Sequence, residues 1–169
     1  DYTDDIYVGY RYFETIPGAA EKVVYPFGYG LSYTTFDVET VSAGVVNSNC
    51  TSEANKLYAK VRVTNTGKFS GKEVVQVYIA KPQGKLGKPA KELAAFEKTR
   101  ELQPGESQLM ILTWEINDMA SYDDLGKVKK SAYVLEAGSY DIYVGTSVRD
   151  VTKADYSYIL NHDVITEQL

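Results

Sequence analysis

The sequence predicts an all-β chain, a β-sandwich preceded by an extended N-terminal arm. Tyrosine and valine are used heavily, and aromatic and β-branched residues favour pleated, half-buried surfaces. From Phe36 onward, short alternating segments are separated by turn residues, as is typical of a sandwich. The length of 169 residues indicates about one domain, and the hydrophobic content is ordinary for a chain that buries a core.

The arm begins with two short extended segments, expected at residues 6–13 and 22–25. Two short strands without partners do not form a stable unit, so the arm needs a surface to pack against. The connector that follows, residues 25–36, alternates aromatic rings with Pro26, Gly28 and Gly30. It is too apolar for a free linker and should be ordered on a neighbouring surface, anchored by its own rings.

The clearest strand lies at residues 57–64, where Leu57, Ala59, Val61 and Val63 alternate with polar residues and Tyr58. Further strands are expected at residues 36–46, 74–79, 93–100, 108–116, 131–135, 139–146 and 154–160.

The sequence also predicts the form of the connections between these strands. Residues 81–89 contain two prolines and two glycines without an apolar cluster, which predicts a mobile loop that contacts a neighbouring domain. Residues 117–122 should form a short helical turn capped by Asn117 or Asp118. The segment 131–146 should form a hairpin or corner around residues 136–138, and the tail from Asn161 should be frayed.

Six motifs resemble, in order, a single protein family. They are YVGYRYF (7–13), YPFGYGLSYTTF (25–36), VTNTG (63–67), GKEVVQVY (71–78), KELAAFEK (91–98) and GSYDIYVGTS (138–147). Together they are similar to the C-terminal part of glycoside hydrolase family 3 enzymes of the β-glucosidase and β-xylosidase type. The resemblance implies that residues 1–35 are the terminal piece of an α/β sandwich domain with its aromatic connector. It implies an immunoglobulin-like, fibronectin type III-like sandwich at 36–160 and a tail or linker at 161–169.

The same resemblance implies a parent enzyme that hydrolyses terminal, non-reducing β-D-glucosyl residues with retention, with β-xylosides as the second choice. In the family, the nucleophile lies in a barrel domain and the proton donor lies earlier in the α/β domain. Neither segment is present, so no catalytic residue is assigned and the chain alone should be inactive, an accessory and stabilising region. Substrate-binding residues stay unassigned, no cofactor is implied, and the expected partners are the barrel and α/β domains, which hold the carbohydrate. Whether those domains precede or follow this region stays open.

Residue types that could perform chemistry occur without the partner residues that catalysis or metal binding would need nearby in the sequence. The acidic pairs Asp4-Asp5, Asp123-Asp124 and Glu97 with Glu101 are expected to be solvated surface carboxylates, although glycoside hydrolysis needs two opposed carboxyl groups. His162 is the only histidine and has no second ligand nearby in sequence, which disfavours a metal site, and no metal is expected. The residues around Ser32 lack the second glycine of a nucleophile elbow. Cys50 stands alone, within a glycosylation sequon at residues 49–51.

The net charge of −5 disfavours nucleic acid and anionic membranes, because both prefer a basic face. No apolar run is long enough to span a bilayer. We therefore expect a soluble protein, and a cytoplasmic or a secreted location stays open.

One alternative remains beside the accessory role. A free-standing immunoglobulin-like module that binds carbohydrate or protein would need an exposed aromatic row, for which the candidates are Tyr133, Tyr140, Tyr143, Tyr156 and Tyr158. Tyr140 is also the candidate for a tyrosine corner, in which its hydroxyl bonds to upstream backbone. Trp114 is expected to be a core or interdomain ring. Without its α/β domain, the arm should be disordered or should associate with the arm of a second copy.

Overall fold

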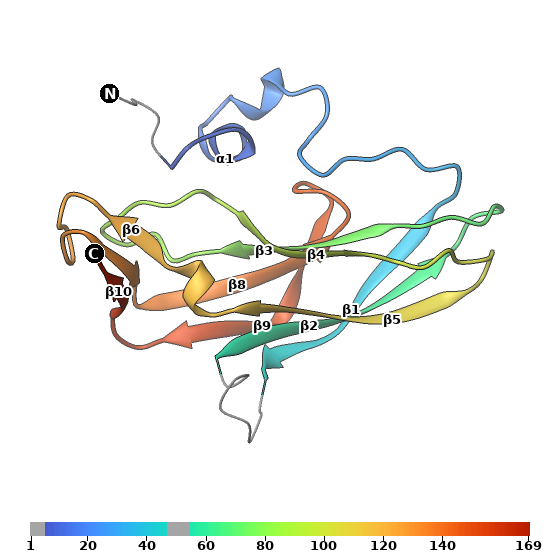
Figure 1. Cartoon of the computed structure of the whole chain (residues 1–169). Helices are drawn as coiled ribbons and strands as arrows, with labels where there is room; N and C mark the ends of the chain where they lie inside the picture. Colours follow the sequence, from blue (N-terminus) through green and yellow to red (C-terminus); the bar gives the residue numbers. More distant parts are fainter. Residues whose placement is uncertain (1–5, 47–54) are drawn as a thin grey trace.

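The computed structural model describes residues 6–46 and 55–169, and it is essentially all-β, as predicted. Two antiparallel sheets face one another (Figure 1). The first sheet has the order β1-β2-β5, with β1 at Phe36–Val45, β2 at Lys56–Asn65 and β5 at Ser107–Glu115. The second has the order β4-β3-β8-β9, with strands at Glu92–Lys98, Val74–Ala80, Gly138–Gly145 and Val151–Leu160.

The core lies between these two sheets. The alternation predicted for β2 is confirmed, because Leu57, Ala59, Val61 and Val63 are all fully buried. They meet inward residues of β5, which is paired with β2 in register, and the buried valines of β3 on the opposite sheet. Apolar alternation with a period of two therefore places one face of each central strand in the core.

A third, small sheet corrects the expectation of a frayed tail, and the turn before it corrects the expected helix cap. It has the order β10-β7-β6, with β10 at Val164–Gln168, β7 at Ala132–Leu135 and β6 at Ser121–Asp123. The tail is therefore not frayed: β7 offers a free edge, and β10 pairs with it. The short 3-10 turn η2 (Asn117–Met119) is present, but its N-cap is Ile116 and no side chain caps it.

The segment around Glu136 is a corner and not a hairpin, because β7 and β8 lie in different sheets. The hydroxyl of Tyr140 donates a hydrogen bond of 2.8 Å to the carbonyl oxygen of Glu136. Tyr140 is fully buried. The predicted tyrosine corner is confirmed.

The arm contains helical turns where extended segments were expected. Helix α1 spans Tyr10–Thr15, and the 3-10 turn η1 spans Ala20–Lys22. Gly9 precedes α1 with φ 59°, and Ile16 leaves it in an extended conformation, which Pro17 imposes on the residue before it. Aromatic residues favour strands only where a pleated partner is available, and here Tyr10 packs through a helix instead.

Candidate functional site

The arm lies across the outer face of the second sheet, above β3 and β4 (Figure 1). Tyr10 of α1 is the central contact. Its ring stacks on Phe27 at 4.3 Å between centroids and meets Tyr78 of β3 edge-on at 6.4 Å. Its hydroxyl oxygen accepts a hydrogen bond of 2.9 Å from the amide of Leu93 on β4, an edge strand. The side chain of Tyr10 thus holds the arm to the sheet and provides an acceptor for a backbone amide of edge strand β4.

Beneath the arm, Gln76 of β3 joins three segments. Its amide nitrogen donates to the carbonyl oxygens of Gly28 at 3.0 Å and Thr146 at 2.7 Å. Its amide oxygen accepts from the hydroxyl of Tyr78 at 2.6 Å. Gly28 has φ 80°, and a Cβ there would overlap the Gln76 side chain. Both faces of β3 are consequently buried, and burial raises the pKa of the Tyr78 hydroxyl, with smaller effects from Tyr10 and Glu14.

Polar contacts fix the rest of the arm. The hydroxyl of Thr15 accepts a hydrogen bond from the amide of Ala90 at 2.8 Å. The guanidinium of Arg149 pairs with Glu14 at 2.8 Å and donates to the carbonyl oxygen of Ala20 at 3.1 Å. The expectation that the arm lacks support from its own sandwich is wrong, and with it the reason for expecting disorder or pairing with a second copy.

The connector and Val24, the residue before it, expose much of their apolar surface. Val24, Tyr25, Leu31 and Tyr33 are 83%, 67%, 89% and 97% exposed, and Tyr25 stacks on Tyr29 at 5.2 Å between ring centroids. We call these four residues the connector face. Backbone hydrogen bonds, Phe27 and Phe36 hold the connector in place. Its other rings, Tyr25, Tyr29 and Tyr33, are exposed, so they do not supply the anchoring expected of them.

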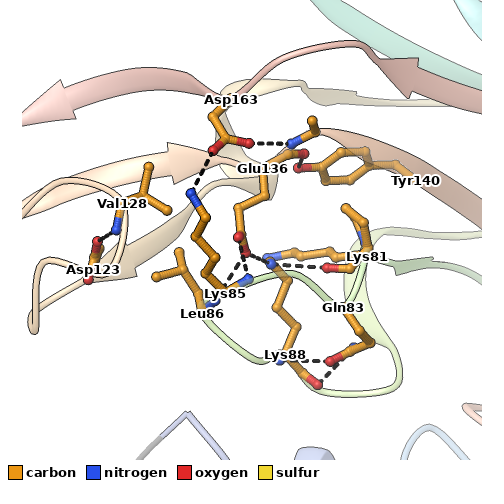
Figure 2. A network of polar contacts seen from close by, with 12 residues as sticks. Lys81, Gln83, Lys85, Leu86, Lys88, Asp123, Val128, Glu136, Tyr140 and Asp163 are labelled. Carbon is orange, nitrogen blue, oxygen red and sulfur yellow. Dashed lines mark hydrogen bonds and ion pairs between the residues drawn. The ribbon is translucent and has the colours of Figure 1, made fainter.

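The loop at residues 81–89 is not the mobile segment that its composition predicts (Figure 2). Lys88 is 1% exposed, and its ammonium group pairs with the buried carboxylate of Glu136. The same carboxylate accepts from the amides of Lys85 and Leu86, at 2.6 and 3.3 Å. Burial alone would raise the pKa of Glu136, but the hydrogen bonds from Lys88, Lys85 and Leu86 hold it below its ordinary value.

Comparisons with known proteins agree with this architecture. The fibronectin type III-like domain family matches residues 73–148. β-Glucosidase A of Butyrivibrio fibrisolvens is 58% identical over the whole chain, which covers 21% of that protein. The crystal structure of a β-glucosidase from Paenibacillus barengoltzii superimposes with a TM-score of 0.90 at 48% identity, over 99% of this chain and 18% of that one.

This chain corresponds to a part of family 3 β-glucosidases that contains a fibronectin type III-like domain. The resemblance stated from the motifs is confirmed. A second solved structure, β-glucosidase 3B of Thermotoga neapolitana in complex with α-D-glucose, superimposes with a TM-score of 0.82 at 39% identity, over 98% of this chain and 21% of that one. The chain spans about a fifth of the length of these relatives, whose remaining domains lie in the same polypeptide.

The acidic residues singled out in the sequence lie mostly on the surface of the described structure. Glu97, Glu101 and Asp124 are exposed, as expected, and Asp4 and Asp5 lie outside the described residues. Asp123 is the exception: it is buried and accepts hydrogen bonds of 2.6–3.0 Å from the amides of residues 126–129. Burial would raise the pKa of Asp123, yet these four amides lower it to about 2. Sequence reasoning missed this role, although Gly126 near Asp123 indicates a tight turn.

The remaining candidates for chemistry are His162 and Cys50. His162 is exposed, and no group of three metal-ligating side chains occurs within residues 6–46 and 55–169. Cys50 and its sequon fall outside the described part. No helix in the described part is long and apolar enough to cross a membrane.

The tyrosines proposed as a sugar-binding row do not form one in the fibronectin-like region. Tyr140 is buried, and Tyr156 and Tyr158 pack against the core. Tyr143 is half-buried beneath the ammonium group of Lys91, and Tyr133 is 38% exposed on the third sheet. Trp114 is a core ring, as predicted.

Proposed function

We propose that this chain is the accessory, stabilising region of a retaining β-glucosidase that removes terminal, non-reducing β-D-glucosyl residues. The names of the relatives support the activity of the parent enzyme. The observation that favours an accessory role is the connector face: four large apolar side chains within ten residues are mostly exposed, and exposed apolar surface that is concentrated in this way often marks an interaction site. In this proposal the face docks against the barrel and α/β domains of the same enzyme.

The division of the chain belongs to the same proposal. Residues 1–35 would complete an α/β domain, residues 36–160 would form the fibronectin-like sandwich, and residues 161–169 would close it or lead onward. The arm then has two partners: its inner side rests on β3 and β4, and its outer side meets the α/β domain. An independent carbohydrate-binding module receives less support, because the candidate tyrosines are mostly buried or scattered.

Docking is tested by removing apolar surface from the connector face in a complete enzyme. We would place this chain into the Paenibacillus barengoltzii β-glucosidase in place of its corresponding region and compare Leu31→Ser/Tyr33→Ser with the unaltered hybrid. Two buried apolar side chains contribute about 1.5–3 kcal/mol each, so the hybrid should melt several degrees lower. The 169-residue chain alone should melt unchanged, because both residues are already exposed there.

Ile111→Ser on β5 is the matched control, since Ile111 is 59% exposed on the other sheet. It should leave the melting of the hybrid unchanged. Equal melting of the hybrid with and without the Leu31 and Tyr33 substitutions would count against docking through the connector face.

The chain alone should hydrolyse no aryl β-glucoside or aryl β-xyloside. Glycoside hydrolysis requires two opposed carboxyl groups, and the acidic residues singled out in the sequence are exposed or, for Asp123, held by backbone amides wherever the structure describes them. Release of a chromogenic aglycone by the purified chain, abolished by a substitution within it, would contradict this prediction.

A further inference from the structure

Within the described residues, the two large sheets have four edge strands, β1 and β5 in the first sheet and β4 and β9 in the second. The pairing of β1, β4 and β9 with their neighbours is interrupted by a register shift in each case. These three strands also carry several charged side chains: Asp37 and Glu39 on β1, Glu92, Glu97 and Lys98 on β4, and Lys153 and Asp155 on β9. Bulges and charges hinder the addition of a further strand, so these three edges are protected.

Strand β5 lies at the edge of the first sheet (Figure 1) and lacks both kinds of protection. It pairs with β2 over its nine residues without a register shift. Its sequence, SQLMILTWE, contains no proline. Its one charge, Glu115, stands at the end of the strand and pairs with Lys56 of β2 at 3.5 Å. A long, flat and almost uncharged edge of this kind readily accepts another strand.

The unpaired backbone groups of β5 are identified from the two ends of its ladder. The carbonyl oxygen of Glu106 accepts a hydrogen bond of 2.9 Å from the amide of Asn65, and the amide of Ile116 donates one of 2.8 Å to the carbonyl oxygen of Asn55. Because bonded residues alternate along an antiparallel ladder, the even-numbered residues bond to β2. The N–H and C=O groups of the odd-numbered residues point away from β2 and bond to no other described residue. These residues are Ser107, Leu109, Ile111, Thr113 and Glu115.

This edge is complementary to itself. When a second β5 lies antiparallel with Ile111 opposite Ile111, each odd-numbered residue meets an odd-numbered residue, so each free N–H and C=O gains a partner. Leu109 then lies opposite Thr113, and Leu109 and Ile111, which are 50% and 59% exposed in the single chain, become covered. Glu115 meets Ser107, so no like charges lie opposite one another. A shift along the strand would leave some of the free groups unpaired.

We propose that β5 is an interface between two copies of this chain, which join their first sheets edge to edge about a two-fold axis at Ile111. The partner is a second copy because both register and charge match when β5 faces itself. The pairing uses the unprotected edge of each copy, so it closes at a dimer. One strand pair is a small interface, which gives weak association with a Kd of about 0.1–1 mM. This inference does not rest on the β-glucosidase proposal, because it needs no other domain.

Sedimentation velocity of the 169-residue chain measures the association. The mass should be that of a monomer at about 10 µM and should rise toward that of a dimer at about 1 mM, without larger species. Thermal melts at about 10 µM observe the monomer, so Ile111→Ser remains a valid control for the connector face at that concentration.

Amide exchange measured by NMR locates the interface. Between the dilute and the concentrated sample, the amides of Leu109, Ile111 and Thr113 should become protected from water, because they gain acceptors in the second copy. The amides of Met110 and Leu112 bond to β2 in both samples and are the internal reference. Their exchange should not change.

Ile111→Lys places two ammonium groups opposite one another at the two-fold axis and should weaken association about tenfold. Ile159→Lys is the matched control, since Ile159 is 58% exposed on edge strand β9 of the other sheet and undergoes the same chemical change outside the interface. It should associate like the parent.

Four outcomes would each overturn the proposal. They are a chain that stays monomeric at about 1 mM, unchanged association in Ile111→Lys, an equal loss of association in Ile159→Lys, and protection of the three β5 amides that does not depend on concentration. Unchanged association in Ile111→Lys that is abolished by Leu31→Ser/Tyr33→Ser would assign the contact to the connector face instead.

Discussion

Glu136 stabilises the structure through its backbone and its side chain together. Its carbonyl oxygen receives the hydroxyl of Tyr140, and its carboxylate receives Lys88 and two loop amides. The motif around Tyr140 was recognisable in the sequence because the corner depends on local spacing. The buried charges were not, because the partner of Glu136 lies 48 residues away and composition alone predicts exposure for both lysine and glutamate.

Tyr140→Phe should lower the free energy of unfolding by about 0.5–1.5 kcal/mol, the usual net contribution of one hydrogen bond. Tyr140→Ala should lower it by about 3–5 kcal/mol, because it also leaves a cavity in the core. Urea denaturation measures both values. Tyr143→Phe is the control, since no hydrogen bond of its hydroxyl occurs in the described structure, and it should denature like the parent. An unchanged midpoint for Tyr140→Phe would contradict the contribution of the corner.

Asp123 should make stability depend on pH at the acid end. Its pKa is about 2 in the folded chain, below the value of about 3.9 in an unfolded one. The unfolded state therefore binds the proton first, so the stabilisation is complete above pH ~4 and is lost as the pH falls through ~2. Asp123→Asn should be less stable than the parent at pH 7, and this difference should shrink between pH 4 and 2. Thermal melts across this range, with the exposed Asp124→Asn as control, would contradict this if the two substitutions behaved alike.

At the scale of elements, the strands were predictable and their surroundings were not. Alternation located most core strands within one or two residues, and the start of β9 within three, because burial of one face imposes a period of two. The same rule missed that Gln76 and Tyr78 on the outer face of β3 are buried, since the arm that covers them is distant in sequence. The pairing of β10 with β7 was missed for a similar reason: a five-residue segment becomes a strand only when a strand edge is available for it to pair with.

The loop at residues 81–89 should lose its order when its buried charge pair is broken. Glu136→Ala leaves the ammonium group of Lys88 buried without a counter-charge and two loop amides without acceptors. The cost should be about 3–5 kcal/mol of unfolding free energy, measured by chemical denaturation. Lys85→Met, which removes the exposed 3.9 Å pair with Asp163, is the control and should cost less than about 1 kcal/mol. Equal effects would indicate that the loop is held by something other than Glu136.

At the scale of the whole molecule, the arm and the sandwich form one packed unit. The arm supplies Tyr10 and Thr15 as acceptors for amides of Leu93 and Ala90, at and beside the start of edge strand β4. Family motifs in the sequence located both parts but suggested that the arm belonged to another domain. The contacts that join it to the sheet depend on side chains up to 135 residues apart, which no local pattern reports.

Hydrogen exchange in a dilute sample should therefore show protection of the Leu93 amide without any second copy. Tyr10→Phe removes its acceptor while keeping the aromatic stack, so exchange at Leu93 should accelerate about tenfold. The amide of Ala90, held by Thr15, is the internal control and should exchange at its original rate. Rapid exchange at both amides in the unaltered chain would mean that the arm detaches in solution.

The close fit of Gly28 against Gln76 has a consequence for recombination between related enzymes. These two positions lie on either side of Phe36, the first residue of the sandwich and so the obvious junction for a chimaera. A chimaera joined there would inherit position 28 from one parent and position 76 from the other, and any side chain larger than hydrogen at 28 would collide with an unaltered glutamine. A crossover ahead of Ile6 transfers both halves of this fit together. The arm and the sandwich should therefore be exchanged together, as one continuous segment.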